Sequence, residues 1–416
     1  MSPTPSAATP WTCPFCPLLC DGYALAQGPD GLALVGSDCP RAAASLARCA
    51  SATVTPTIDG QPASADAALD AAARLLAAAR QPLFGGLGTD VDGARALYPL
   101  ACATGAISDA AGGEALLHTL RALQDRGQFT TTLAEVRNRA DLIVCIGESP
   151  RENLPEIWRR LGVGRGDDER LVAQREIVFI GAPADPVLAG RAGIDASSVP
   201  LQGDLFDTVA LLAACIAQRR VAAPPAIAAL AERLRAARYA VLMFESKRLP
   251  AQGTLIVEAL NQAVATLNRS TRAALLPLGG GDGASSVNQT WTWLSGLPLR
   301  SRAGPLGLEH EPLRYGAQAL IDDGAVDALL WVASFGTEPP CPPGALPTVV
   351  LGGPGVAAPA RGVFIPVATP GLGGSGHLFR TDSSVVLPLE PVRDDGLPGV
   401  ADVAKALTAR VRALKT

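Results

Sequence analysis

Hydrophobic residues along the chain follow two alternating periods. Segments with apolar positions three or four residues apart predict helices, and continuous apolar runs predict strands buried on both faces. Ser64 stands at the start of one such helix as an N-cap. The predicted helices are residues 64–80, a stretch ending near Thr104, and residues 151–161, 204–217, 251–267 and 399–414. The predicted strands are residues 82–87, 141–147, 176–181, 239–244, 272–278, 327–333, 348–351 and 363–367.

Strands that alternate with helices over most of a chain are typical of parallel sheets covered by helices on both faces. The predicted fold class is therefore α/β, and 416 residues favour two packed α/β units over one. We expect a Cys-rich β unit at residues 1–54, with a hairpin that turns at Gly28–Gly31. Two α/β domains are expected to follow it. The first is discontinuous and comprises residues 55–140 and 325–416, and the second comprises residues 141–324. Residues 162–170 and 279–290 are expected to be polar loops.

Composition narrows the range of partners. The net charge is -4, and Lys and Arg are not clustered among aromatic residues, so nucleic acid is not expected as a partner. The longest apolar runs are shorter than the roughly 18 residues that cross a bilayer. Residues 1–10 lack the basic and apolar regions of a signal peptide and are expected to form a frayed tail. These features predict a cytoplasmic protein without membrane contact.

Four of the nine cysteines lie in the first 39 residues. Cys13-x2-Cys16-x3-Cys20, closed by the distant Cys39, could bring four thiolates around one metal centre. Thiolates suit an iron–sulfur cluster or zinc. The alternative is a set of buried, inert thiols, because Cys often behaves as a small hydrophobic residue. That interpretation is preferred for the five scattered cysteines, which are Cys49, Cys102, Cys145, Cys215 and Cys341.

The N-terminal sequence WTCPFCPLLCDGYAL, followed by Cys39-Pro40-Arg41, resembles the B subunit of formylmethanofuran dehydrogenase. Residues 121–150, 326–339 (VDALLWVASFGTEP) and 364–382 (FIPVATPGLGGSGHLFRTD) extend the resemblance over essentially the whole chain. That subunit is a molybdopterin oxidoreductase. The resemblance therefore implies two Rossmann-like parallel-sheet units behind a cluster domain. It also implies that Cys13, Cys16, Cys20 and Cys39 occupy the four ligand positions of a [4Fe-4S] cluster.

The departures from the family pattern concern the reactive centre. Asp92 stands where the resemblance places a metal-ligating Cys, and the position of the catalytic His aligns near Ala115. His118 lies close by in a predicted helix, and we interpret it as a surface or capping residue. The positions that would hold the pterin also differ, and they read Ser149-Pro150, Gly181-Ala182-Pro183 and Phe335-Gly336. A molybdenum or tungsten pterin is therefore expected to be absent.

This combination is similar to the B-like subunit of the formyltransferase/hydrolase complex of methylotrophic bacteria. The resemblance implies a non-catalytic structural subunit with A, C and D subunits as partners. Such a complex converts formyl-tetrahydromethanopterin to formate through a methanofuran-type carrier. The alternative is a redox-active dehydrogenase subunit with a molybdenum or tungsten pterin and a [4Fe-4S] cluster. Whether the cysteine array is occupied stays open at this point.

Two other segments are candidate binding sites. Gly279–Gly283 could cradle a phosphate but lacks a nucleotide-binding fingerprint, so a flexible loop is preferred. The loop GLGGSG at residues 371–376 could help Arg380 to bind an anionic carrier tail, and Lys247 is a second candidate for that contact. A structural turn is the preferred interpretation of this loop. Three histidines, including His310 and His377, supply a His-based metal site poorly.

Overall fold

The computed structural model describes residues 8–28, 31–50, 55–163 and 172–416. The chain divides into two compact units. Unit 1 comprises Met1–Gly113, Gly280–Arg380 and Val385–Thr416, and unit 2 comprises Glu114–Gly279 and Thr381–Ser384. Within the described ranges, no helix is both long enough and apolar enough to cross a membrane.

This division differs from the predicted domain boundaries because strand pairing connects segments that are distant in sequence. Residues 280–324 join unit 1, where Ser301 pairs antiparallel with Ser108. Residues 114–140 join unit 2, where the backbone N–H of Thr131 donates to the carbonyl of Leu275 at 2.9 Å. The predicted unit at residues 1–54 does not separate from unit 1.

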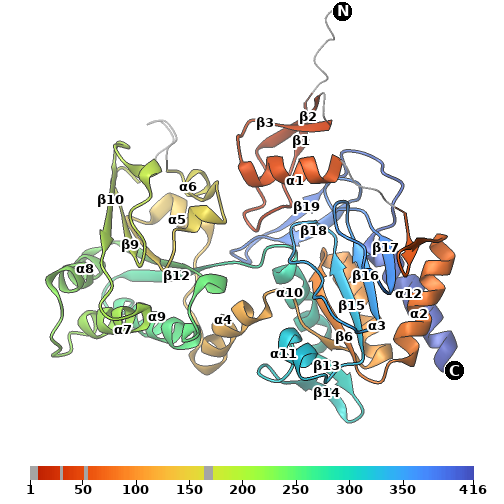
Figure 1. The fold of residues 1–416 in the computed structure, drawn as a ribbon. Helices are drawn as coiled ribbons and strands as arrows, with labels where there is room; N and C mark the ends of the chain where they lie inside the picture. The colour runs from red at the N-terminus through yellow and green to blue at the C-terminus, as the bar shows by residue number, and fades with distance from the viewer. Residues whose placement is uncertain (1–7, 29–30, 51–54, 164–171) are drawn as a thin grey trace, which may run out of the picture. The chain divides into compact units, whose positions relative to one another are not determined.

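The core of unit 1 is a nine-stranded sheet with the order β14-β13-β7-β6-β15-β16-β17-β4-β5. Its central strands, β7 to β17, run parallel, and β6, β15 and β16 are buried along their whole length. Figure 1 shows β6, β15, β16 and β17 side by side. The strands are β4 (Thr57–Ile58), β5 (Gln61–Pro62), β6 (Pro82–Gly88), β7 (Ile107–Ser108), β13 (Ser301–Gly304), β14 (Gly307–His310), β15 (Ala328–Ala333), β16 (Thr348–Gly352) and β17 (Val363–Pro366).

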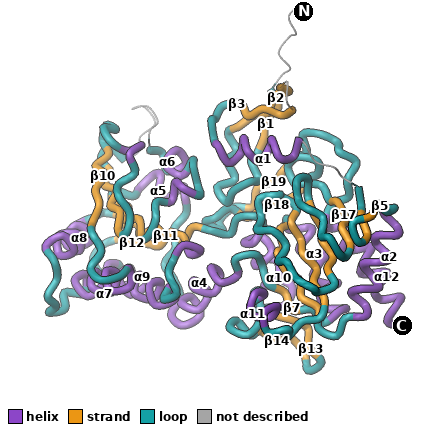
Figure 2. Tube along the Cα trace, in the orientation of Figure 1, coloured by secondary structure: helices purple, strands orange, loops and turns teal. Residues whose placement is uncertain are grey.

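Helices cover this sheet. The last helix, α12 (Val400–Lys415), packs against both α2 (Ala65–Ala78) and α3 (Val91–Thr104), and Figure 2 shows α2 and α12 adjacent. Ser64 caps α2 by accepting a hydrogen bond from the N–H of Ala67, which confirms the predicted N-cap. The other helices are α10 (Ala284–Ser295) and α11 (Ala317–Asp322), and a short hairpin pairs β18 (Gly376–Phe379) with β19 (Val386–Leu389).

The Cys-rich segment of unit 1 contains a three-stranded antiparallel sheet and a helix. The strands are β1 (Thr9–Trp11), β2 (Tyr23–Gly28) and β3 (Gly31–Val35), and α1 (Pro40–Ala50) follows. The predicted hairpin is confirmed by the pairing of β2 with β3. The expected frayed tail is wrong for Thr9 and Pro10, which pair with β2, while residues 1–7 lie outside the described ranges.

Unit 2 contains a five-stranded sheet in which all pairs are parallel, with the order β10-β9-β8-β11-β12. Apolar side chains from the sheet and from α7, α8 and α9 form one core. The strands are β8 (Leu142–Ile146), β9 (Arg175–Ile180), β10 (Ile194–Val199), β11 (Tyr239–Glu245) and β12 (Arg272–Leu278). The helices are α4 (Gly113–Arg126), α5 (Leu133–Arg139), α6 (Ile157–Arg160), α7 (Leu205–Ile216), α8 (Pro225–Ala236) and α9 (Gly253–Leu267), with 3-10 turns at Pro150–Glu152, Pro186–Leu188 and Ser246–Arg248.

Two further local predictions are wrong. The sequence predicts a loop at residues 279–290, but α10 begins at Ala284, after Gly283 adopts a left-handed φ of 76° at the N-cap. Small polar residues hide this helix because they carry little apolar periodicity. Residues 151–161 form a 3-10 turn and the short α6 instead of one helix. Of the expected loop at residues 162–170, residues 164–170 lie outside the described ranges.

Candidate functional site

The sheet of unit 1 reverses its strand order between β6 and β15. The chain passes from β6 to β7 in one direction and from β15 to β16 and β17 in the other. In doubly wound α/β folds, such a reversal leaves a crevice at the carboxyl ends of the strands, where ligands bind. Gly86 and Leu87, with φ values of 71° and 51°, bend the end of β6 into this region. The residues that follow β6 and β15 therefore form the first candidate site.

Asp90 follows β6 and caps α3. Its Oδ1 accepts a hydrogen bond from the N–H of Gly93 at 3.0 Å, and its Oδ2 accepts from Asp92 and His377, both at 3.3 Å. The side chain is buried, and this burial raises the pKa of Asp90 against the opposing effect of the three N–H donors. The first amides of a helix can otherwise bind phosphate. In α3, the protein's own carboxyl occupies them.

Glu338 follows β15 and also points into the switch point. Although the residue as a whole is partly exposed, its carboxyl is enclosed: Oε1 accepts from the N–H of Phe335 at 2.8 Å. Oε2 is buried and has no hydrogen-bond partner among the described residues. A Cβ atom on Gly88 would collide with Glu338 Oε1, so the carboxyl fills the space beside that glycine. Burial, with the nearby charge of Asp282, raises the pKa of Glu338 to about 8.

The four cysteines of the array are all buried. The loop that carries three of them closes through hydrogen bonds from Cys13 N–H to the carbonyl of Cys20 (2.9 Å) and from Leu19 N–H to the carbonyl of Cys16 (3.1 Å). Burial raises the pKa of Cys13 and brings that of Cys16 to about 12, and repulsion from the other thiolates adds to the shift. The four cysteines are thus buried thiols of one segment of unit 1.

The donor set of the array consists of four buried thiols. In the described part of the chain, no three His, Cys, Asp or Glu side chains converge as ligands of one metal ion. A [4Fe-4S] cluster has a different requirement, because each thiolate binds its own iron and the sulfur atoms stand farther apart. Four buried thiols supply the donor chemistry that a cluster requires.

Arg41 connects the cysteine loop to the switch point. Its Nε donates to the carbonyl of Phe15 within that loop, and its guanidinium pairs with Asp282 at 3.4 Å. The hydroxyl of Thr337 donates to the same Asp282 carboxylate at 2.5 Å. The cysteine loop and the segment that carries Glu338 are thus tied to each other through one ion pair and its hydrogen bonds.

The sheet of unit 2 reverses its strand order between β8 and β11. Side chains from the two following loops join across this second switch point. Arg248, after β11, forms ion pairs with Glu148 and, at 2.7 Å, with Glu152 after β8. Asn153 donates to the Glu245 carboxylate at 2.9 Å. Ser149-Pro150, one of the positions that the resemblance assigns to pterin binding, lies within this network.

The remaining sequence-predicted residues are dispersed. Asp92 is exposed in the first turn of α3 in unit 1, whereas Ala115 is half-buried in α4 of unit 2. The prediction of a surface position for His118 is wrong: only 7% of the residue is exposed, because α4 packs its ring against Gly253 at the start of α9. Its Nδ1 lies 3.3 Å from the hydroxyl of Thr254.

Among the scattered cysteines, Cys49 and Cys145 are buried as expected, but Cys102 is exposed and Cys215 and Cys341 are half-buried. Sequence reasoning missed Asp90, Glu338 and Arg248. Asp90 carried a detectable signal, since Asp before a helix is a strong N-cap. Glu338 and Arg248 carried none, because each is defined by a partner from another segment.

These features fit a molybdenum or tungsten pterin poorly. The anionic tails of such a cofactor need donors at the strand ends. Unit 1 presents the carboxyls of Asp90 and Glu338 there, with the α3 amides already occupied. In unit 2, Arg248 at the second switch point is already paired with two carboxylates.

Two parallel-sheet units and a buried four-cysteine segment define a protein built like the B subunits of formylmethanofuran dehydrogenases. The B subunit of the tungsten-containing formylmethanofuran dehydrogenase 2 of Methanocaldococcus jannaschii is 28% identical over 282 residues, which cover 65% of this chain and 64% of that protein. Its counterpart in Methanococcus maripaludis is 26% identical and covers 84% of both chains. No family model matches the chain.

The B subunit of the formyltransferase/hydrolase complex Fhc of Methylorubrum extorquens is 31% identical over 360 residues, which cover 85% of this chain and 96% of that protein. A chain in the crystal structure of the formyltransferase/hydrolase complex (FhcABCD) from Methylorubrum extorquens, in complex with methylofuran, superposes with a TM-score of 0.75. That match is 30% identical and covers 86% of this chain and 99% of the other. The chain belongs to the family of formyltransferase/hydrolase complex B subunits.

Proposed function

We propose that this chain is a non-catalytic structural subunit of a formyltransferase/hydrolase complex. The observation that carries the proposal is its match along 99% of a chain taken from an assembled FhcABCD complex. Its partners are then homologues of the A, C and D subunits, and the complex works with a methylofuran-type carrier. By resemblance, the assembly converts formyl-tetrahydromethanopterin to formate in bacterial one-carbon oxidation. The architecture is that of a degenerate molybdopterin oxidoreductase.

The two switch points support the absence of a reaction centre in this chain. In unit 1, Asp90 occupies the helix amides and the Glu338 carboxyl fills the space beside Gly88. In unit 2, Arg248 spans the crevice by pairing with Glu148 and Glu152. A chain that keeps the scaffold and fills both strand-end crevices with its own polar side chains is suited to holding partners rather than to binding a large cofactor.

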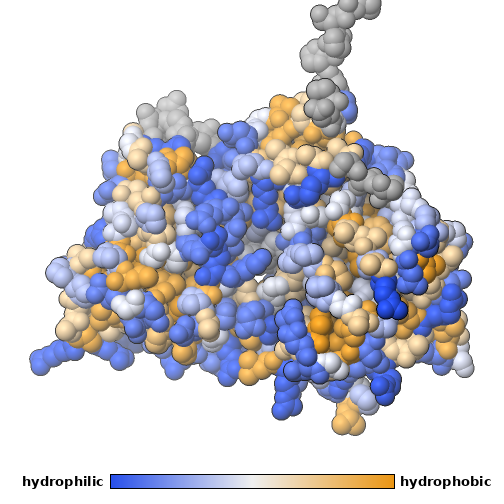
Figure 3. Space-filling model, viewed as in Figure 1, coloured by the Kyte–Doolittle hydropathy of each residue, from blue (hydrophilic) through white to orange (hydrophobic). Residues whose placement is uncertain are grey.

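The Cys-rich segment offers a surface for a partner subunit. Strand β3 is an edge strand with the apolar sequence GLALV, and none of its residues is fully buried. Figure 3 shows apolar side chains over this part of the chain. Exposed apolar edges favour pairing with another chain. We therefore expect the isolated chain to be monomeric or prone to aggregation, and its partners to protect it.

Co-expression with the homologous A, C and D subunits tests the proposal. We expect an affinity tag on this chain to recover all three partners, and metal and pterin analysis of the assembly to find no stoichiometric molybdenum, tungsten or pterin. A stable solitary homodimer that recovers none of them would refute the structural role. A pterin-bound molybdenum or tungsten in stoichiometric amount would refute the loss of catalysis.

The redox-active alternative is favoured by one observation, the retention of the four buried cysteines of the array. If a [4Fe-4S] cluster binds, Cys13, Cys16, Cys20 and Cys39 would hold it, and its chemistry would be electron transfer. Iron and sulfide analysis of protein purified without oxygen decides whether the array is occupied. Cys16→Ser should then abolish the visible absorbance of the cluster, with Cys145→Ser, a buried thiol outside the array, as the control. Unchanged folding and assembly in iron-free Cys16→Ser protein would show that the array is vestigial.

A further inference from the structure

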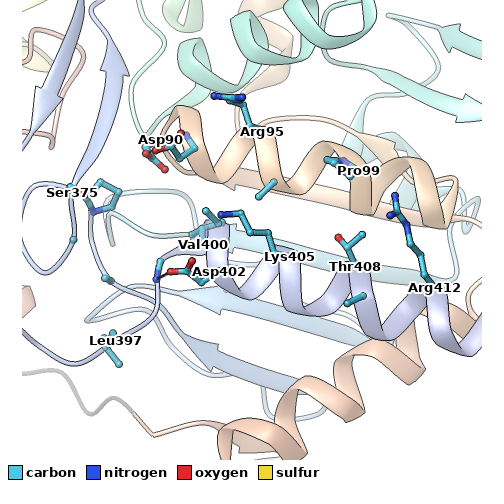
Figure 4. A pocket seen from close by; sticks show the side chains of 18 residues that line it. Asp90, Arg95, Pro99, Ser375, Leu397, Val400, Asp402, Lys405, Thr408 and Arg412 are labelled. Atoms are coloured by element: carbon cyan, nitrogen blue, oxygen red, sulfur yellow. Dashed lines mark hydrogen bonds between the residues drawn. The ribbon is translucent and has the colours of Figure 1, made fainter.

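A groove of about 870 Å³ lies between α3 and α12 in unit 1. Loop residues around Ser375 and Leu397 close one end of it (Figure 4). Its volume is within the range of small-molecule pockets in proteins. The groove is separate from the cysteine array and from Glu338, which do not line it.

Three cationic side chains line this groove. Lys405 and Arg412 extend from α12 towards α3, whereas Arg95, at the edge of the opposite wall, directs its guanidinium away from α12 (Figure 4). All three are exposed, and none forms an ion pair within the described ranges. Arg410, which belongs to the same helix but faces away, instead pairs with Asp66 and Asp70 of α2. On α12, the cations that face the groove are therefore without ion pairs in the described part of the chain, whereas Arg410 on another face is paired.

The acidic residues of the groove lie at its other end, and two of them are already engaged. Asp90 accepts three backbone hydrogen bonds, as described above, and Asp402 accepts one from the N–H of Gly399 at 3.2 Å. Asp92 is the only lining carboxylate without such a bond in the described part of the chain. A carboxylate that accepts a hydrogen bond keeps its charge, so the groove is lined by equal numbers of acidic and basic side chains, and its positive charge is concentrated along α12 from Lys405 to Arg412, away from Asp90 and Asp402 (Figure 4).

The spacing of the cations specifies the ligand. Lys405 and Arg412 are two turns apart on one face of α12, which corresponds to about 10 Å along the helix axis. The hydroxyl-bearing Thr408 lies between them and also lines the groove. We propose that this groove binds an elongated small molecule with two or more anionic groups, either carboxylates or phosphates. Lys405 and Arg412 each bind one group. This inference does not depend on the proposed assembly role.

Titration calorimetry with tripolyphosphate and with a tetra-aspartate peptide tests the groove in the full chain, alone or in its co-purified assembly. Binding by one probe only identifies the phosphate or the carboxylate source. Because a charge-assisted hydrogen bond contributes about tenfold in affinity, Lys405→Gln and Arg412→Gln should each weaken binding about tenfold and together about a hundredfold. Higher salt should weaken binding by the wild-type chain more than by the double variant.

The control is Arg74→Gln combined with Arg361→Gln, which removes two exposed positive charges of unit 1 outside the groove. It should bind the probes as the wild-type chain does, and circular dichroism should show that all variants are folded. Absence of binding by both probes, or equal loss in the groove and control variants, would overturn the proposal. If a probe binds but Lys405→Gln and Arg412→Gln do not change its affinity, the proposal is overturned as well.

Discussion

Glu338→Gln should be more stable than the wild-type chain, and this difference in the free energy of unfolding should grow as pH rises. Burial raises the pKa of Glu338 from 4.5 to about 8 in the folded chain. The folded state therefore keeps a proton that the unfolded state releases above pH 4.5, and the stabilising effect of that proton is lost as pH rises from 4.5 towards 8. Gln stays neutral and its amide oxygen can still accept the hydrogen bond from Phe335 N–H.

The shift sets the upper limit of the effect at about 5 kcal/mol, because each pKa unit corresponds to about 1.4 kcal/mol. The free energy of unfolding is to be measured by urea titration, with circular dichroism as the signal, at about pH 5, 6, 7 and 8, which spans the interval between the two pKa values. We expect the difference between Glu338→Gln and the wild-type chain to be smallest at the lowest pH and to grow by several kcal/mol by the highest. Asp282→Asn should weaken this pH dependence, because removal of a neighbouring negative charge lowers the pKa of Glu338.

Glu390→Gln is the matched control, because Glu390 is exposed on the same unit. Its stability relative to the wild-type chain should not vary over this pH range. A difference between Glu338→Gln and wild type that stays constant across the range would show that the Glu338 carboxyl is ionised in the folded protein. The account of the unit 1 switch point as a site filled by a neutral acid would then be wrong.

Three further substitutions, measured by urea unfolding, test contacts within each of the two units. Gly283→Ala should lower the free energy of unfolding by about 2–4 kcal/mol, because its φ is 76° and the added Cβ would overlap the backbone oxygen of Thr89. The control is Gly112→Ala, which has a similar φ of 74° but open space around it and should lower the free energy of unfolding by about 1 kcal/mol. Equal costs would contradict the close approach. Arg175→Met should destabilise unit 2 by about 3 kcal/mol, because the buried guanidinium donates to the carbonyls of Val136, Arg137, Ala140 and Leu161. The exposed Arg219→Met should have little effect, and a matching loss there would argue against the carbonyl contacts. Ser64→Ala should cost about 1 kcal/mol through the lost cap of α2, and an unchanged midpoint would show that the cap is replaced by water.

Local pattern along the chain was enough to predict the elements that depend on near neighbours. The strands β6, β8, β11 and β15 are continuous apolar runs, and the structure places each within a residue or two of the prediction. The N-cap at Ser64 was visible because capping involves residues that are three positions apart. The family was also evident from the cysteine spacing and from the segments late in the chain, and the similarity to the Methylorubrum extorquens B subunit confirms it.

Three-dimensional packing was needed to establish which segments share a unit and which side chains meet. The pairing of Ser301 with Ser108 joins two distant segments, and no local period records such a partner. Glu338 becomes a buried acid only because Gly88 leaves it room and Asp282 lies nearby. In the sequence, Lys405 and Arg412 look like ordinary helix cations. They line a groove only because α3 packs against α12 in the folded chain. Periodicity records whether a residue is buried, but a site depends on neighbours that only the folded chain brings together.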